Sequence, residues 1–198
     1  MKYFVIGLHS SGKQEVINTL ESMGVKCGKI FSNLASPAPD IYGSENYEYY
    51  DNLDINNIFE NDAYIFMQDV PNLKSAEKCY EGRSKYTFDN NDVFVLSPDQ
   101  LIAIPPTAIN EEICFVWLDN NKMNRTSRYH NEKRLYNFIE RDKYERRDIS
   151  SFVKTIYSFN NSSLLYFANE EPVRVATIIH TLLKYPETFK LFVKNFNN

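Results

Sequence analysis

Short apolar runs alternate along the chain with segments in which apolar residues recur at helical spacing. The apolar runs are rich in β-branched and aromatic residues and predict strands at residues 3–6, 25–31, 63–67, 85–88, 92–96, 113–118 and 164–168. The segments of helical period predict helices at residues 13–22, 53–59, 72–80, 122–147, 172–183 and 188–196. Because strands alternate with helices, we expect an α/β fold with a mainly parallel sheet flanked by helices. The run ICFVWL at 113–118 is the most apolar and predicts an interior strand buried on both faces.

The first predicted strand is followed directly by a turn that carries two glycines. Residues 7–13 read GLHSSGK, which satisfies the phosphate-loop pattern GxxxxGK and lies between a strand and a helix, as that motif requires. In such a loop backbone N–H groups surround a polyphosphate, the lysine reaches its β and γ groups, and the next helix directs its N-terminus at the phosphates. The pattern predicts an ATP-binding loop and a phosphate-loop (P-loop) NTPase fold. Its nucleotide-binding residues are Gly7, His9, Ser10, Ser11, Gly12, Lys13 and Gln14, and Lys13 is also predicted to be catalytic.

The loop departs from the usual motif at its last position. Gln14 stands where Ser or Thr normally offers a hydroxyl to Mg²⁺. An amide oxygen can accept a metal or a metal-bound water, so we predict Gln14 as a metal contact, direct or through water. The same departure is compatible with a loop that has lost catalysis.

Charge is unevenly distributed along the chain. The whole chain has 22 Lys and Arg against 26 Asp and Glu, which argues against a polycation built to coat nucleic acid. Residues 122–147 nevertheless contain nine basic and four acidic side chains, so this segment is +5 and the remainder −9. Arginine-rich helical residues after an interior strand predict a lid over a transferred phosphoryl group. A nucleic-acid-binding patch and a solvated helix remain as alternatives.

Other features narrow the class of protein. The three cysteines lack CxxC spacing, which argues against a disulfide framework and against a zinc site. No apolar run approaches the roughly 20 residues of a membrane span, and the apolar start of the chain is too short for a signal-peptide core. We therefore expect a cytoplasmic protein without a membrane partner.

The order of these motifs resembles the nucleoside monophosphate kinases, and within them the guanylate kinase family. The resemblance spans nearly the whole chain, although only the phosphate loop is a specific motif. It implies a core formed by residues 1–33, 85–120 and 160–198, an inserted acceptor-binding lobe at about 34–84, and a lid at about 121–150. YEYY at 47–50 and RSKYT at 83–87 look like the tyrosine-bearing segments of the family's acceptor lobe, and FANE at 167–170 looks like its strand end beside the nucleotide base.

The resemblance also implies roles for individual residues. Phosphate-bridging arginines of the lid correspond to Arg125, Arg128 and Arg141, of which Arg128 and Arg141 are predicted to be catalytic and Arg125 to contact the nucleotide, as Asn169 does. The predicted acceptor-binding residues are Ser32, Tyr47, Tyr50, Tyr86 and Asp99. The family's serine at the position of Ser32 is followed by two arginines that are absent here, so a deoxynucleotide or a modified pyrimidine monophosphate stays open as acceptor, as in a phage or viral enzyme.

The predicted function is phosphoryl transfer from ATP, with Mg²⁺, to a nucleoside or deoxynucleoside monophosphate. One alternative is a guanylate kinase-like binding module with weak or no catalysis. Another is a P-loop kinase that acts on a non-nucleotide or polynucleotide acceptor. We expect no stable nucleic-acid partner, and a homodimer is one of the oligomeric states left open.

Overall fold

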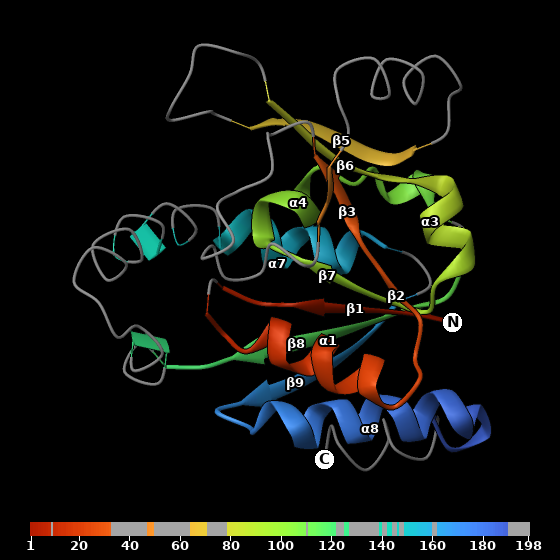
Figure 1. Ribbon diagram of the computed structural model, residues 1–198. Coiled ribbons are helices and arrows are strands. Elements are labelled where there is room, and N and C mark those ends of the chain that lie inside the picture. The colour runs from red at the N-terminus through yellow and green to blue at the C-terminus, as the bar shows by residue number, and fades with distance from the viewer. Residues whose placement is uncertain are drawn as a thin grey trace.

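A computed structural model describes residues 1–8, 10–32, 47–49, 64–70, 79–109, 111–121, 125–126, 139, 142–143, 146, 149–159 and 162–189. Two sheets and the helices packed on them make up these residues (Figure 1). The main sheet has five parallel strands in the order β2-β7-β1-β8-β9. Their bounds are Lys2–Ile6 for β1, Cys27–Gly28 for β2, Val93–Leu96 for β7, Ile113–Asp119 for β8 and Ser162–Ala168 for β9. The expected α/β class with a mainly parallel sheet flanked by helices is therefore confirmed.

Alternate side chains of β1 enter two separate hydrophobic cores, one on each face of the main sheet. Tyr3 and Val5 belong to the core under the helices α1 and α8, whereas Phe4 and Ile6 belong to the core under α3, α4 and α7. The helices are α1 at Lys13–Ser22, α3 at Lys85–Asn90, α4 at Pro98–Ile102, α7 at Ile149–Ser158 and α8 at Pro172–Lys184, with short 3₁₀ turns η2 at Pro106–Ala108 and η3 at Pro186–Thr188. β1 and β8 are buried from both sides, which explains their continuous apolar runs.

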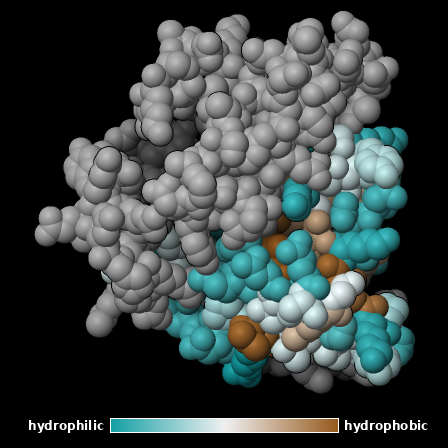
Figure 2. Space-filling model, viewed as in Figure 1, coloured by the Kyte–Doolittle hydropathy of each residue, from teal (hydrophilic) through white to brown (hydrophobic). Residues whose placement is uncertain are grey.

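The outer face of the α1 and α8 layer is mostly hydrophilic. Figure 2 shows teal and pale side chains over these two helices, with hydrophobic residues in small separate groups. Both helices bury one apolar stripe, and they pack side by side under the sheet (Figure 1). Among the described residues no helix has the length and apolar character needed to span a membrane.

The second sheet has four strands in the order β4-β3-β6-β5. Their bounds are Ile30–Ser32 for β3, Tyr47–Tyr49 for β4, Tyr64–Val70 for β5 and Cys79–Ser84 for β6. β3 pairs with β4 in parallel and with β6 in antiparallel orientation, and β5 pairs with β6 in antiparallel orientation. The strand predicted at 63–67 corresponds to β5.

Three predictions of secondary structure are corrected. The single strand expected at 25–31 is two strands, and they pair in different sheets. The strand expected at 85–88 is the helix α3, because the Ser84 side chain accepts a hydrogen bond from the Thr87 N–H at the start of that helix. The helix expected at 72–80 is contradicted at its end, where Cys79 and Tyr80 begin β6.

The other expected elements at 3–6, 13–22, 92–96, 113–118, 164–168 and 172–183 match the structure to within two residues at either end. The helix expected at 53–59 lies outside the described residues. Most of the segments expected as helices at 122–147 and 188–196 also lie outside them, although the described positions 125–126, 139, 142–143 and 146 are helical. Thr188 ends η3, whereas Phe189 is helical.

Candidate functional site: a phosphate loop at the strand ends

The loop after β1 lies at the point where successive strands of the main sheet switch from one side of β1 to the other. From β1 the chain continues through β2 and β7 on one side of β1, and then through β8 and β9 on the other (Figure 1). β1 therefore ends between β7 and β8, with Ile6 in register with Leu96 and Trp117. Open α/β sheets bind ligands outside the carboxyl ends of their strands at such a switch point. The sheet topology thus places the loop where a ligand is expected.

The loop backbone has the conformation that its two glycines permit. Gly7 has φ +154° and Gly12 has φ +100°, and Ser10 between them has φ 60°. A Cβ on Gly7 would lie 2.6 Å from the Leu118 carbonyl oxygen of β8. Within the loop, the Ser11 N–H donates to the Leu8 carbonyl across 3.1 Å. Glycine is needed at both positions, by close approach at Gly7 and by a left-handed backbone at both.

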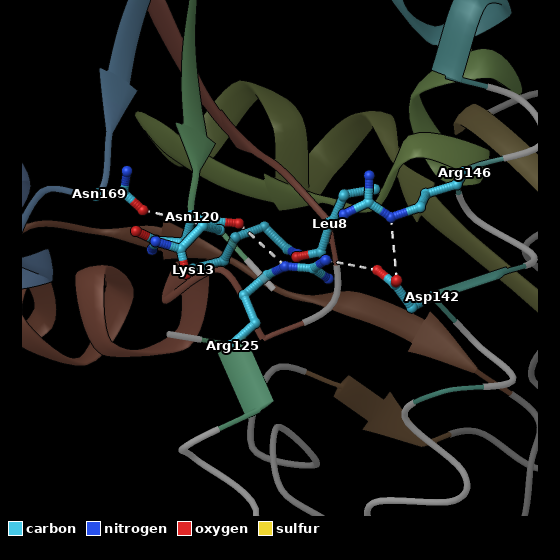
Figure 3. Close-up of polar contacts among 8 residues, drawn as sticks. Leu8, Lys13, Asn120, Arg125, Asp142, Arg146 and Asn169 are labelled. Carbon is cyan, nitrogen blue, oxygen red and sulfur yellow. Dashed lines mark hydrogen bonds and ion pairs between the residues drawn. The ribbon is translucent and has the colours of Figure 1, made fainter. Parts of the chain in front are cut away.

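The Lys13 ammonium folds back over this loop. Its Nζ donates to the carbonyl oxygens of Gly7 at 2.7 Å and Leu8 at 2.9 Å. Figure 3 shows Lys13 and Leu8 in the site. Lys13 is also the first residue of α1, so its charge adds to the positive end of the helix dipole. Loop amides, helix terminus and ammonium together favour an anion at this position.

Gln14 is buried in the first turn of α1, at 6% exposure. Its Nε2 donates to Asn18 Oδ1 across 2.7 Å, a contact between neighbouring turns of the helix. Elsewhere in the described part of the chain, no group of three or more His, Cys, Asp or Glu side chains could hold a metal. The predicted metal contact of Gln14 stays a prediction.

Asn120, which the sequence analysis did not select, supports the loop from the end of β8. Its Nδ2 donates to the Ser11 carbonyl oxygen across 2.5 Å, and the side chain is buried. The signal in the sequence is the run Asp119-Asn120-Asn121, which follows the most apolar strand where its carboxyl end meets the loop. Polar side chains at that edge of a parallel sheet are candidates for a functional site.

Asn169 lies at the end of β9 and bonds to the same turn. Its backbone N–H donates to the Asp119 carbonyl at 3.0 Å, and its Oδ1 accepts from the Asn121 N–H at 2.9 Å. Asn169 has φ 54°, a conformation that Asn tolerates better than most residues. The structure thus places this predicted nucleotide contact beside the turn that supports the phosphate loop, as Figure 3 shows.

Arg125 is buried in an ion pair. Its Nη2 lies 2.6 Å from Asp142 Oδ1, with the arginine side chain fully buried and the aspartate 6% exposed. Its Nε donates to the Asn120 carbonyl at 3.1 Å. Asp142 also accepts from Nε of Arg146 at 3.0 Å, and that arginine is 47% exposed (Figure 3). Burial raises the pKa of the Asp142 carboxyl, but the hydrogen bonds and charges of the two arginines outweigh it, so the pKa is lowered overall.

Asp119 and Tyr166 form a second polar pair at the ends of β8 and β9. The Tyr166 hydroxyl donates to Asp119 Oδ2, and Tyr166 is 42% exposed. This hydrogen bond, together with partial burial and the Asp119 charge, raises the pKa of Tyr166 to about 12. The ring of Trp117 lies between Phe152 and Tyr166 in edge contacts with centroid distances of 5.2 and 5.5 Å.

The remaining predicted site residues lie farther along the chain or outside the described part. Asp99 is in the first turn of α4 and half-buried, and Tyr86 is on α3 with 76% of its surface exposed. Ser32 and Tyr47 are backbone members of β3 and β4, and their side chains lie outside the described residues. The other predicted residues, His9, Tyr50, Arg128 and Arg141, also lie outside them.

Comparison with known proteins finds similarity to solved structures alone. No protein-family model matches the chain, and no curated protein matches it. Among solved structures, a guanylate kinase from Anaplasma phagocytophilum is 13% identical, with a TM-score of 0.45, over 93% of this chain and 84% of that one. An unliganded sugar kinase from a Janibacter species is also 13% identical, with a TM-score of 0.41, over 92% of this chain and 94% of that one.

Proposed function

We propose that this chain is an ATP-dependent phosphotransferase that converts a nucleoside or deoxynucleoside monophosphate to the diphosphate. The observation that carries the proposal is the loop after β1. It combines two glycines at positive φ with a lysine ammonium over the loop carbonyls, at the head of a helix and at the switch point of a parallel sheet. Each of these features favours a polyphosphate.

The residues of the loop fit the triphosphate of ATP. Lys13 now pairs with the carbonyls of Gly7 and Leu8, and β and γ phosphate oxygens are stronger partners for its ammonium than neutral carbonyls are. Backbone N–H groups between His9 and Gln14 would hold the β phosphate. The described residues offer no cluster of metal ligands, so we propose that phosphates and water, rather than protein side chains described here, supply most ligands of Mg²⁺.

The transfer itself requires positioning and charge neutralisation more than covalent chemistry by the protein. An acceptor phosphate oxygen attacks the γ phosphorus, the bond to the β–γ bridging oxygen breaks, and ADP leaves with that electron pair. Lys13 stays with the phosphates as the charge moves. Arg128 and Arg141 belong to the proposal as the arginines that cover the moving group, although both lie outside the described residues. Two features support a monophosphate as the acceptor. One is the order of the motifs along the chain, and the other is the second sheet, whose strands lie in the sequence between β2 and β7.

One observation favours a second candidate, a nucleotide-binding module without turnover. The Gln14 amide is buried and bonded to Asn18, where the usual motif has a hydroxyl that serves a metal. Such a module would bind a nucleotide through the loop backbone and Lys13 without transferring a phosphoryl group.

An acceptor screen separates the two candidates. Purified protein is incubated with ATP and Mg²⁺ and with each ribo- and deoxynucleoside monophosphate, modified pyrimidines included, and ADP formation is followed. The phosphotransferase proposal predicts ADP formation that depends on one acceptor or a small group of them. ATP binding without acceptor-dependent ADP formation would instead favour the binding module.

A further inference from the structure

The peptide between Ser11 and Gly12 is held from outside the phosphate loop. Its carbonyl oxygen, that of Ser11, accepts the 2.5 Å hydrogen bond from Asn120 Nδ2. Because a trans peptide is planar, its C=O and its N–H point in opposite directions. The bond from Asn120 therefore turns the Gly12 N–H away from β8. If this peptide rotated by half a turn, the Ser11 carbonyl would take the place of the Gly12 N–H. A loop that binds anions needs N–H donors on its inner side.

Asn120 is itself held by a fully buried cation. Arg125 Nε donates to the Asn120 carbonyl at 3.1 Å, and the Arg125 N–H donates to the Asn121 carbonyl, also at 3.1 Å. The guanidinium has no exposed surface, so its charge depends on a partner within the protein. Asp142 is such a partner, at 2.6 Å. The support of the phosphate loop thus extends, bond by bond, from Ser11 through Asn120 and Arg125 to Asp142.

Asp142 belongs to the arginine-rich segment, and it also binds the half-exposed Arg146. A shift of this segment that withdrew the Asp142 carboxylate would remove an ion-pair partner 2.6 Å from the buried Arg125 charge, which is costly. The position of the segment and the orientation of the Ser11–Gly12 peptide are therefore energetically linked.

We propose that Asn120 is a positioning residue for the phosphate loop, and that the Arg125–Asp142 ion pair makes the orientation of the Ser11–Gly12 peptide depend on the arginine-rich segment. The inference rests on the proposed function only in treating the loop as a polyphosphate site. It assigns Arg125 to support of the loop and not to direct contact with phosphate.

The test uses the scarcity of glycine in this chain. Selective ¹⁵N-glycine labelling gives a spectrum of at most six backbone amides, and the Gly12 amide belongs to the peptide in question. Asn120→Asp keeps the shape but replaces the donor with an acceptor. The Gly12 resonance should move, whereas that of Gly24, which lies beyond the other end of α1, should not. The new carboxyl is buried against the Ser11 carbonyl, which favours its protonated form, so lowering the pH from about 8 to about 4 should restore a donor and return Gly12 toward its wild-type position. A merely structural defect would not be reversed by protons.

Asp142→Asn tests the second half of the proposal, with Asp89→Asn on the exposed surface of α3 as the control for lost charge. Asp142→Asn should move the Gly12 resonance and Asp89→Asn should not. A Gly12 resonance unmoved by Asn120→Asp, or by Asp142→Asn, overturns the proposal. Should Asn120→Asp not fold, Asn120→Ala removes the same donor and makes the same comparison.

Inorganic tripolyphosphate distinguishes failure of this inference from failure of the proposed function. Added to the wild type, it should move the resonances of Gly7 and Gly12. If it moves neither, the loop is not a polyphosphate site, yet the comparison of Asn120→Asp with the wild type still decides whether Asn120 orients the peptide.

Discussion

The Arg83 guanidinium donates a hydrogen bond of 2.7 Å to the carbonyl oxygen of Gly28. Arg83 is on β6 of the second sheet and Gly28 is on β2 of the main sheet, so this contact joins the two. The same side chain, 1% exposed, also donates to the carbonyls of Lys29 and Val95 and lies over the ring of Phe94. A single buried arginine therefore fixes the main sheet to the sheet that interrupts it.

Replacing Arg83 should destabilise the protein strongly. Arg83→Met keeps the apolar stem but leaves three carbonyl oxygens without their charged donor, and we expect a loss of about 2–4 kcal/mol of unfolding free energy. Arg174→Met is the control, because that arginine is 69% exposed and its pair with Glu170 is a surface ion pair, so it should cost less than about 0.5 kcal/mol. Urea titration measures both, and equal losses would contradict the role of Arg83.

Gly7 and Gly24 should respond differently to alanine. Gly7→Ala places a Cβ 2.6 Å from the Leu118 carbonyl and should distort the loop, so ATP binding measured by calorimetry should be lost. Gly24→Ala also imposes a positive φ on alanine, at +84°, but meets no neighbouring atom. It should cost about 1 kcal/mol of stability and leave ATP affinity unchanged. Wild-type ATP affinity in Gly7→Ala would argue against the proposed loop geometry.

The Arg125–Asp142 pair should make stability depend on pH in a defined direction. The Asp142 pKa is lowered in the folded state, so the contribution of this carboxylate is fully present above its ordinary value of 3.8 and is lost as the pH falls through the folded-state value. Asp142→Asn should cost about 3 kcal/mol at neutral pH, because it removes the carboxylate that pairs with the buried Arg125 charge. The difference between wild type and variant, measured by urea titration at several pH values, should shrink below about pH 4. A difference that grew on acidification would have the wrong sign.

The Tyr166 hydroxyl should lose its proton at unusually high pH because of Asp119. Its pKa is raised to about 12 by the hydrogen bond to that carboxylate, and Asp119→Asn should bring it down toward 10.0. Glu170→Gln, two residues beyond β9, removes a carboxylate that pairs with Arg174 and should leave Tyr166 unchanged. NMR of ¹³C-labelled tyrosine resolves the titration, and an unchanged pKa in Asp119→Asn would show that the pair does not persist in solution.

Several elements could be predicted from sequence because one local signal decides them. Residues 13–22 form a helix with a glycine just beyond its end, and Gly24 has the positive φ of that position. The strand at 113–118 is buried on both faces, so its apolar run has no polar interruption. The loop at 7–13 could be predicted because its two glycines, Gly7 and Gly12, stand at the defining positions of the sequence motif.

Elements decided by tertiary contacts were not predictable in this way. Residues 25–31 have the β-propensity of one strand, but the Phe94 ring and the Arg83 guanidinium lie against Gly28, where a Cβ would come within 2.4 Å of the ring, and the chain then leaves the main sheet. Residues 85–88 also have β-propensity, which the Ser84 cap and the burial of Phe88 override.

The residues of the candidate site also fall into those that a local sequence signal predicts and those that depend on tertiary contacts. Lys13 follows from its motif, whereas Asn120 depends on the approach of β8 to the loop, which no local pattern records. Arg125 has the sequence context of a phosphate-binding arginine, and only the position of Asp142, 17 residues later in the chain, shows that its charge is buried and paired.

Lys13→Ala tests the central claim, that the loop after β1 positions a polyphosphate for transfer. With the acceptor that the screen identifies, the variant should lose about a hundred- to a thousandfold in kcat. Its unfolding free energy should change by no more than about 1 kcal/mol, because the ammonium donates to neutral carbonyls of a loop. Lys154→Ala, on the exposed side of α7, should match the wild type in both respects. Wild-type turnover in a folded Lys13→Ala protein would contradict the account.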